Sequence, residues 1–543
     1  MLSEAVWQLS RIDFLHQAFD PLTPQGRRRK ETKRFITDAR QLASQYDLTD
    51  AALALIERRA SEIDRIEYHL KRMPDLAGLA DLESLGSPDV FVVKKFLLNY
   101  RALAGLLDAP AMQAFGLRFK LQELLARLDV EDAGEETFYV SDRYLPELRS
   151  LRREIQAHDQ ALKDLRAEAN RMLLAEDELD FRFRDFLVVP NEKAARLSRE
   201  KVFVEPHDNQ SVVVRPVMSQ QYLLKHAARE KLALGERKLE RQVLEELSGL
   251  IRRELQRLFD YAGLVEQLDV SLAHARLCRR FGLTRPVLGA PGGAVFAGGA
   301  RLLPLEDRCR REGLKYWPLD IRLDERAGVI HGSNMCGKTV AIQTVAFCQI
   351  AAQLGFFVPA GRFETTVFDE LHFIGPAPAA PEEGLSSFAA EIVGLSQALS
   401  PGGRTKLLLV DEFARTTNSR EAVALLSGLL AWLTEQPGIR SLLATHCKPL
   451  PRLSGLTYYR MKGLRWEAFE RDCPAGASGS PSDRVRNIHR YVEYQVLLDT
   501  DDSQAYDALR VAEALGLDPD ILARARHYAD LDQCSITDEP MDK

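Results

Sequence analysis

A glycine-rich turn near the middle of the chain carries residue types that bind phosphate. It has two glycines separated by four residues, followed at once by a lysine and a threonine. Backbone N–H groups of such a turn, the positive end of the next helix and the ammonium meet the charges of a nucleotide. The threonine hydroxyl is a ligand for Mg²⁺. The predicted nucleotide-binding residues are Gly332, Ser333, Asn334, Met335, Cys336, Gly337, Lys338, Thr339 and Val340.

The residues around this turn supply the context that the pattern needs. Ala327 to His331 is predicted to be a short buried strand, and Val340 to Gln353 is predicted to be a helix with one apolar side. Strand, glycine turn and helix in this order are typical of a phosphate loop. The alternative is a glycine turn that only joins a strand to a helix, and the complete pattern favours the nucleotide site.

An acidic pair follows a second apolar run. Four apolar residues, Leu407 to Val410, lead directly into Asp411 and Glu412. A buried parallel strand of this kind delivers charge at its carboxyl end. We expect Asp411 to hold Mg²⁺ and Glu412 to act as the general base of ATP hydrolysis. The alternative is a strand that ends in a solvated turn.

A third apolar run, Ser441 to Ala444, ends at Thr445 and His446. A histidine at a strand end can sense a phosphate or orient a water molecule. Taken alone, His446 is more often a structural hydrogen-bonding residue. The predicted catalytic residues are therefore Lys338, Glu412 and His446.

These motifs together resemble the MutS family of DNA mismatch-repair ATPases. The resemblance rests on Asn334-Met335 in the turn, on Asp411-Glu412, on Ala444-Thr445-His446, and on the segment 384–391. It implies ATP and Mg²⁺ as cofactors and a dimer with shared sites. In such a dimer Ser386, with Glu391 in the same signature, would act at the nucleotide of the opposite subunit.

The resemblance also suggests a residue that stacks on adenine. Tyr316 aligns loosely with the aromatic residue in that role, Trp317 is an equal candidate, and core packing is the alternative for both. One departure concerns the turn itself, where the family has a glycine at the position of Cys336. We expect the Cβ of Cys336 to crowd the turn.

The elements that must position these residues predict an α+β multidomain protein. Its mostly helical core and lever, with a coiled-coil arm and a small β clamp, precede an α/β P-loop ATPase domain of the ABC type. The arm follows from apolar residues at three-four spacing between Leu148 and Met172 and again between Val243 and Leu272. The expected ranges are 1–142 for the helical core, 143–275 for lever helices with a β-tip at about 181–217, 276–300 for a linker, and 301–543 for the ATPase domain with C-terminal helices.

The first thirty residues add to the resemblance. The run from Asp20 to Arg29 resembles the opening of the MutS core domain, so we expect a truncated form without the mismatch-recognition and connector domains. Candidate phosphate-binding cations are Arg27, Arg28, Arg29, Lys30, Lys33, Arg34, Arg182, Arg184, Lys193, Arg196 and Arg199. A solvated face with nearby acids is the more common explanation of such residues.

Composition narrows the setting of the protein. A chain of 543 residues with 73 basic and 79 acidic residues has a net charge of −6, which argues against indiscriminate coating of nucleic acid. Seven cysteines without a CxxC pair are typical of free thiols in a reducing compartment. Neither a signal peptide nor an apolar run of about 20 residues is evident, so we expect a cytoplasmic protein without a membrane segment.

Two functions fit these expectations. Both share a dimeric ATPase, formed with itself or with a paralogous subunit, that converts ATP hydrolysis into movement of helical arms. In the first, the arms hold DNA for repair or recombination without standard mismatch reading. In the second, the protein remodels another protein. Some truncated MutS-like proteins resemble this chain and are associated with cobalamin-dependent amino-acid aminomutases, where they act as reactivation factors.

Overall fold

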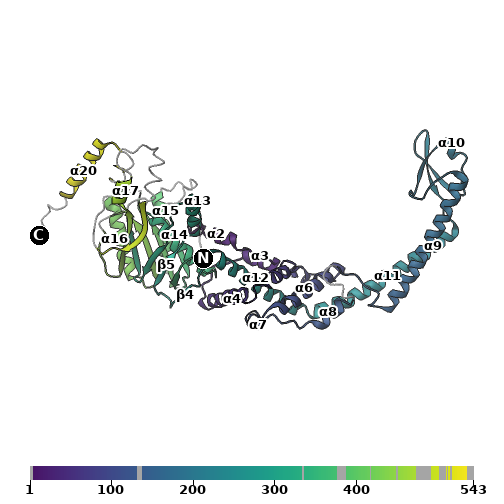
Figure 1. The fold of residues 1–543 in the computed structure, drawn as a ribbon, viewed down its shortest axis with the longest axis horizontal. Coiled ribbons are helices and arrows are strands. Elements are labelled where there is room, and N and C mark those ends of the chain that lie inside the picture. Colours follow the sequence, from purple (N-terminus) through teal and green to yellow (C-terminus); the bar gives the residue numbers. More distant parts are fainter. Residues whose placement is uncertain are drawn as a thin grey trace.

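The computed structural model describes residues 4–82, 84–130, 137–332, 336–375, 387–400, 402–415, 417–447, 450–472, 491–500, 509, 512–513 and 517–534. Figure 1 shows an elongated molecule with a sheet-rich part near one end, a body of helices in the middle, and a long arm at the other end. The predicted mixture of helices and sheets is confirmed. Every helix among these residues is too short or too polar to cross a lipid bilayer.

The helical body has its own apolar core. Its central helix, α12, is buried on most sides, and Tyr261 on it stacks on Tyr100 of α6 with ring centroids 3.9 Å apart. Burial of such large aromatic side chains is a major source of stability. The elements of the body are α3 (Pro24–Glu31), α4 (Ala39–Arg58), α5 (Ile63–Lys71), η1 (Ala77–Leu79), α6 (Ser87–Leu106), α7 (Ala109–Phe115), α8 (Gln122–Leu128) and α12 (Leu255–Phe281). The N-terminal helices α1 (Glu4–Ser10) and α2 (Asp13–Ala18) pack instead in the apolar cluster of the sheet-rich part.

A buried carboxylate fixes the start of α3 to α12. Asp269 is fully buried and accepts hydrogen bonds from the N–H groups of Leu22 and Thr23 at 2.9 and 2.8 Å, and from the Thr23 hydroxyl at 2.7 Å. A Cβ at Gly26 would lie 2.4 Å from the Asp269 carboxylate, so only glycine fits there. The Thr-Pro-Gln-Gly turn of the sequence is therefore a docking point between two helices of the body.

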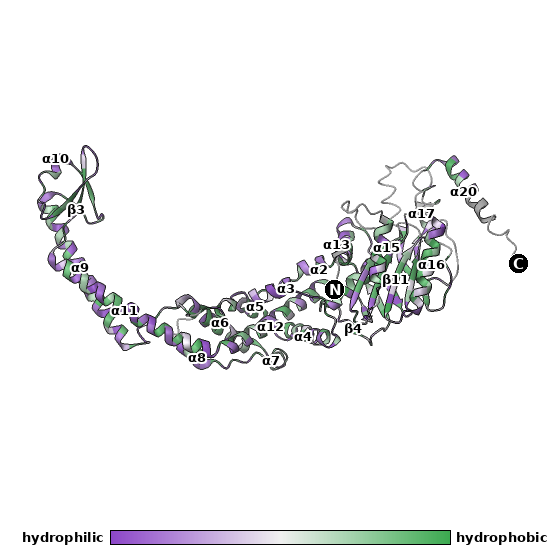
Figure 2. Ribbon diagram, turned by 180° about the vertical axis from the view of Figure 1, so that it is seen from behind, coloured by the Kyte–Doolittle hydropathy of each residue, from purple (hydrophilic) through white to green (hydrophobic). Residues whose placement is uncertain are grey.

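The arm consists of two long antiparallel helices, α9 (Pro146–Asp177) and α11 (Gln220–Arg253). Figure 2 shows hydrophobic and hydrophilic residues alternating along both of them. Near the body the seam is as expected, because Leu148, Ile155 and Leu162 are buried. Toward the tip it differs from the prediction. Met172 is 51% exposed, and Leu173 occupies the buried position instead.

At its base the arm is tied by ion pairs. The guanidinium of Arg152 on α9 contacts carboxylates of Asp142 at 2.5 Å, Glu236 at 2.6 Å and Glu240 at 2.6 Å. Hydrogen bonds to these carboxylates outweigh burial and raise the pKa of Arg152. One side chain thus joins both arm helices to the segment that leads out of the body.

The second predicted arm helix is interrupted. The apolar pattern continues from Val243 to Leu272, but the chain has a break at Glu254, where α11 ends and α12 begins. Beyond the break the chain packs against α3 and α4 of the body. Residue 275, the expected end of the lever region, lies inside α12.

A three-stranded antiparallel sheet forms the tip of the arm. Its strands lie in the order β1-β3-β2, and a turn held by the Asp208 carboxylate connects β2 to β3. Val189, Val202 and Val214 are buried on one face of the sheet, toward the end of α9. The tip elements are β1 (Leu187–Pro190), α10 (Asn191–Ala194), β2 (Val202–Pro206) and β3 (Ser211–Pro216).

The sheet-rich part is built on six strands in the order β13-β12-β7-β11-β10-β9. Neighbouring strands are parallel except for β13, which pairs with β12 in the antiparallel sense. The chain returns to the sheet through helices, as parallel pairing requires. These elements are β7 (Ala327–His331), α14 (Lys338–Gln353), β9 (Glu370–Ile374), α15 (Ser387–Ala398), β10 (Lys406–Asp411), α16 (Ser419–Glu435), β11 (Ile439–Thr445), β12 (Leu456–Leu464), α17 (Trp466–Asp472), β13 (Val492–Leu498) and α20 (Pro519–Cys534).

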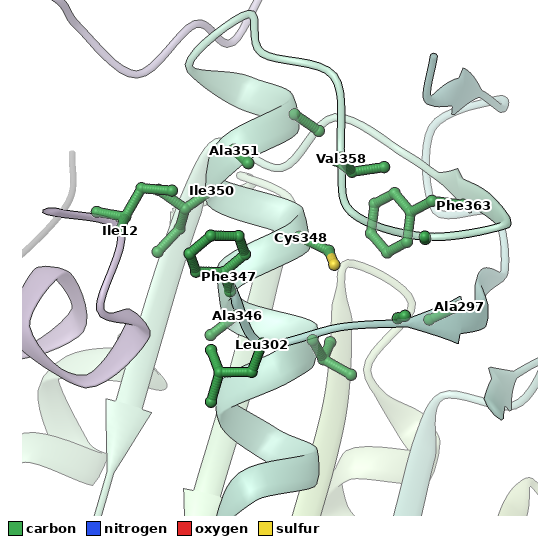
Figure 3. Packing of buried hydrophobic residues seen from close by; sticks show 14 of the residues in the cluster. Ile12, Ala297, Leu302, Ala346, Phe347, Cys348, Ile350, Ala351, Val358 and Phe363 are labelled. Atoms are coloured by element: carbon green, nitrogen blue, oxygen red, sulfur yellow. The ribbon is translucent and has the colours of Figure 1, made fainter. Parts of the chain in front are cut away.

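Helices cover both faces of this sheet. Alternate residues of β10 point to opposite faces, so Leu409 packs in the apolar cluster with α14, and Leu408 packs in the cluster with α16. Figure 3 shows Phe347 of α14 directed toward Ile12, whereas Cys348 faces Phe363 on the other side of the helix. Helix α14 is therefore enclosed by the sheet, the N-terminal segment and a smaller sheet.

The smaller sheet has the strand order β4-β8-β5-β6. The range 276–300, expected as a linker, supplies two of its strands together with the end of α12. The glycines and the proline of residues 289–293 lie in a tight turn before β5, and the pairing between β5 and β6 is irregular, so this range is not an open connection. Its elements are β4 (Val287–Leu288), β5 (Val295–Ala300), α13 (Leu303–Glu312), β6 (Leu319–Leu323) and β8 (Arg362–Thr365).

Candidate functional site

The glycine turn lies at the carboxyl end of β7, which is buried along its whole length. Ser333, Asn334 and Met335 lie outside the described residues. Gly337 has a φ of +95°, and a Cβ there would lie 2.8 Å from the ring of Tyr494. This position therefore requires glycine for both conformation and space.

Cys336 fits the turn because position 332 has no side chain. Its residue is 4% exposed, and a Cβ at Gly332 would lie 2.6 Å from its Sγ. The crowding expected from a side chain at position 336 is thus relieved by the glycine four residues earlier. The thiol packs against the backbone where β7 ends.

Lys338 opens α14 and is directed back to the turn. Its side chain is 4% exposed, and Nζ donates a hydrogen bond to the carbonyl of Gly332 at 2.7 Å. The same ammonium lies 3.6 Å from Oε1 of Glu412. The positive charge is therefore held between the turn and the acidic pair, beside the N-terminus of the helix, where anions are stabilised.

Thr339 and Asp411 meet across the end of the sheet. The Thr339 hydroxyl donates to Oδ2 of Asp411 at 2.8 Å. Burial, together with repulsion by Glu412, raises the pKa of Asp411 against the effects of Thr339 and Lys338. Oδ1 of Asp411 is buried and accepts no hydrogen bond from the described residues.

These oxygens fit the requirements of Mg²⁺, which prefers hydroxyl and carboxylate ligands. The uncompensated Oδ1 is an acceptor that a cation would satisfy. No cluster of three or more His, Cys, Asp or Glu suited to a metal occurs among the described residues. An ion at Asp411 and Thr339 would therefore complete its shell with phosphate oxygens and water.

Glu412 has two cationic neighbours and a nearby histidine. Its side chain is 13% exposed, and its carboxylate lies 3.6 Å from Lys338, 3.6 Å from Arg415 and 3.8 Å from Nδ1 of His446. His446 follows β11, which lies between β7 and β10, and its side chain is 43% exposed. The three strand ends thus bring the predicted catalytic residues together, with His446 too far from Glu412 for a hydrogen bond.

The signature residues are placed differently from one another. Ser386 lies outside the described residues. Glu391 is 7% exposed on α15, and its Oε2 accepts a hydrogen bond from the Ala414 N–H at 2.9 Å. The carboxylate of Glu391 therefore contacts its own chain.

A cleft of about 1260 Å³ is lined by Lys338, Thr339, Asp411 and Glu412. Both aromatic candidates, Tyr316 and Trp317, line it. The Tyr316 hydroxyl accepts a hydrogen bond from the Leu302 N–H at 2.7 Å, and burial raises its pKa to about 12. One face of the Trp317 ring is covered by the ammonium of Lys315, 3.6 Å from the ring centroid. Tyr316 therefore also has a structural role, because its hydroxyl is bonded to the backbone of Leu302.

Sequence reasoning missed other residues of the cleft. Tyr494 of β13 lies beside Gly337, and burial raises its pKa to about 12. Arg308 and Cys309 of α13 also line the cleft. No local motif marks these residues, because they reach the site only through pairing of distant strands and packing of α13.

The fold is a mixture of helices and sheets, and the candidate site is a cluster of charged residues at the carboxyl edge of a largely parallel sheet. Residues 328–530 match the family model of MutS domain V. Endonuclease MutS2 of Thermomicrobium roseum is 30% identical over 408 residues, which are 71% of this chain and 47% of the relative. DNA mismatch repair protein MutS of Thermus thermophilus is 27% identical over 501 residues, which are 88% of this chain and 56% of the relative.

The chain belongs to the MutS family, as its motifs suggest. A further relative, DNA mismatch repair protein MutS of Thermosipho melanesiensis, is 26% identical over 307 residues, which are 56% of this chain and 34% of the relative. The chain spans between 34% and 56% of the length of these three relatives.

Proposed function

We propose that this protein is a dimeric ATPase that couples ATP binding and hydrolysis to movement of its helical arm, and that it acts on DNA in repair or recombination. The observation that carries the ATPase proposal is the cluster at the sheet edge. Lys338, Thr339, Asp411 and Glu412 face one cleft and lie within 3.6 Å of one another in pairs. This set contains a phosphate cation, metal ligands and a general base.

Each residue has a distinct task in this proposal. Lys338 and the N–H groups at the start of α14 bind the phosphates, and Trp317 or Tyr316 stacks on the base. Thr339 and Asp411 hold Mg²⁺, which neutralises charge on the phosphates when bound. Glu412 accepts the proton of the attacking water.

The domain roles are part of the same proposal. Residues 301–543 are proposed as the ATPase domain, residues 1–142 together with α12 as the core, and residues 143–253 as the lever with its tip. Ser386 is proposed to reach the nucleotide of the opposite subunit. The proposal for the lever rests on the tight joint between body and sheet-rich part, where the Tyr46 hydroxyl donates to the Ala352 carbonyl at 2.7 Å.

Neutralising Asp411 separates the magnesium role from stability. Asp411→Asn is expected to weaken Mg²⁺-dependent nucleotide binding by at least about tenfold, because a charged ligand is lost. The protein without nucleotide should melt about 2 °C higher, since the raised pKa means that the ionised carboxylate destabilises the fold. Isothermal titration with and without Mg²⁺ and thermal melting measure the two effects.

The sign of this pH dependence follows from the raised pKa. As the pH falls through it, Asp411 takes up a proton, the fold gains stability and magnesium affinity falls. Asp411→Asn should show neither change. A substituted protein that binds Mg²⁺-nucleotide normally would remove Asp411 from the metal site.

The proposal for DNA draws on the tip of the arm. Several tip cations have acidic partners, such as Arg182 with Asp180 at 2.7 Å. Within residues 137–332, no ion pair involves the exposed residues Arg184, Arg196 and Arg199. Unpaired, exposed guanidinium groups are suited to the phosphates of a duplex. Curated relatives named for DNA mismatch repair add weight to DNA as the ligand.

Salt dependence tests this part of the proposal. Replacing Arg184, Arg196 and Arg199 together with alanine should make the negative slope of log Kobs against log salt concentration shallower by about 2 to 3, because three phosphate contacts are lost. The matched control, Arg182→Ala, removes a paired guanidinium and should leave the slope nearly unchanged. Fluorescence anisotropy with duplex and branched DNA gives the slopes.

The DNA-binding experiment also bears on the alternative function, the remodelling of another protein. If the unmodified protein binds no DNA at low salt, the DNA proposal fails. A purified cobalamin-dependent aminomutase that instead stimulates ATP hydrolysis would support protein remodelling. DNA that stimulates hydrolysis would count against it.

A further inference from the structure

Helix α15 carries a buried carboxylate to which the scheme above gives no task in its own chain. Glu391 is 7% exposed and accepts a hydrogen bond from the Ala414 N–H at 2.9 Å. Ala414 lies two residues after Glu412. We propose that Glu391 is a positioning residue for Glu412, acting through this backbone N–H; the inference rests on the proposed role of Glu412 as general base.

The loop that Glu391 holds has an unusual backbone. Four non-glycine residues among those described have a positive φ, and two of them are Glu412 at +51° and Ala414 at +60°. Residues with a side chain disfavour this left-handed conformation, so it persists only where surrounding contacts impose it. The conformation of Glu412 is therefore determined by its neighbours and not by local preference.

Contacts at both ends impose the conformation. On one side, the Glu412 N–H donates to the carbonyl of Ala444 at 2.9 Å, which extends the pairing of β10 with β11. On the other side, Glu391 accepts the N–H of Ala414. Between them Phe413 is 3% exposed and packs in the apolar cluster beside α16. The loop is thus pinned before and after Phe413.

This pinning sets the position of the general base. The Glu412 carboxylate reaches Lys338 and Arg415 at 3.6 Å and His446 at 3.8 Å only while the backbone keeps its left-handed turn. Without Glu391, the N–H of the fully buried Ala414 would lack its acceptor, and the loop would relax to recover one. A small displacement of a catalytic group is enough to slow a reaction strongly.

The position of Glu391 on α15 gives this contact a further role. Helix α15 lies against β9 at the edge of the sheet, and Phe388 and Leu395 on it pack on the same apolar cluster as Phe413. A shift of the helix would change the Glu391–Ala414 distance directly. One hydrogen bond therefore links the position of α15 to the position of the Glu412 carboxylate.

Substitution of Glu391 tests the proposal in the full-length protein. Glu391→Ala is expected to lower kcat for ATP about 10- to 100-fold while the Kd for ATP stays within about threefold, because Lys338 and Thr339 are untouched. Glu391→Gln keeps an oxygen acceptor and should recover kcat to within about threefold of the unmodified protein. Steady-state kinetics and isothermal titration calorimetry give both quantities.

A matched control comes from the first turn of α16, which follows this loop. Glu421 is exposed and accepts the hydroxyl of Thr417 at 3.1 Å. Glu421→Ala removes a carboxylate near the loop without touching Ala414, so kcat and Kd should not change. If Glu391→Ala does not fold, Glu391→Asp keeps the charge but withdraws the carboxylate by one methylene, and it should lower kcat at unchanged Kd.

Three results would overturn the inference: normal kcat in Glu391→Ala, normal kcat in Glu391→Asp, or a Glu391→Gln protein as slow as Glu391→Ala. Glu412→Gln measured in parallel separates this outcome from failure of the proposed function. If Glu412→Gln blocks turnover while Glu391→Ala does not slow it, only the positioning role fails. If Glu412→Gln turns over normally, the general-base role fails first.

Discussion

Replacing Lys338 with alanine is expected to raise the Kd for ATP by about 10- to 100-fold. The ammonium is buried between the Gly332 carbonyl and Glu412, at the N-terminus of α14. A charge-assisted hydrogen bond to a phosphate is worth about 1.5 to 3 kcal/mol, and each 1.4 kcal/mol is about tenfold in affinity. Lys338→Ala would also leave the Glu412 carboxylate close to the phosphates without the Lys338 ammonium, which lies 3.6 Å from it. Isothermal titration with a non-hydrolysable ATP analogue measures the change.

Lys406 offers a matched control for the loss of a buried lysine. Lys406 lies on β10, remote from the cleft, and is 5% exposed. Its Nζ donates hydrogen bonds to the carbonyls of Ala398 and Ser400 at 2.9 and 2.7 Å. Lys406→Ala should lower the melting temperature while nucleotide affinity persists. A Lys338→Ala protein that still binds ATP tightly would show that the turn is not the phosphate site.

Glu412→Gln is expected to bind ATP with a Kd within a few-fold of the unmodified protein and to lose turnover by about 100- to 10,000-fold. The amide keeps the shape of the side chain but cannot take the proton of the attacking water, and general-base catalysis contributes a factor of that size. Single-turnover hydrolysis, measured beside equilibrium binding, separates the two effects. Normal hydrolysis in this protein would refute the general-base role.

The same substitution has a second, independent effect. Repulsion by Glu412 contributes to the raised pKa of Asp411, although burial contributes more. Removing the negative charge should lower the pKa of Asp411. Magnesium-dependent nucleotide binding should then persist to lower pH in Glu412→Gln than in the unmodified protein, and binding titrations over a pH series would show it.

Local sequence was sufficient to predict much of this site. The strand before Gly332 and the strand before Asp411 are continuous apolar runs, which is what burial on both faces of a parallel sheet demands. The glycine turn and the acidic pair each stand at the end of such a run. Since parallel strands end at the same edge, Lys338 and Glu412 could be expected to lie near each other.

The remaining features depend on contacts between distant segments. Tyr494 reaches the glycine turn through antiparallel pairing at the sheet edge, which no local pattern marks. The apolar repeat of the second arm helix runs through Glu254 without a proline, and its glycines, Gly249 and Gly263, lie inside α11 and α12, so the break at Glu254 was not predictable. Glu391 belongs to a recognisable run, but its contact with Ala414 depends on how α15 packs on the sheet.

The arm geometry also has a mechanical consequence. At about 1.5 Å per residue, the 32 residues of α9 make a rod about 48 Å long. A rotation of about 10° at its base would displace the tip by about 8 Å, far more than the sub-ångström to ångström adjustments typical of a nucleotide site. The contacts of Arg152 with three carboxylates lie close to the fulcrum. In the proposed arm movement, stiffness at that one point would decide how much of a rotation reaches the tip and how much is lost as bending.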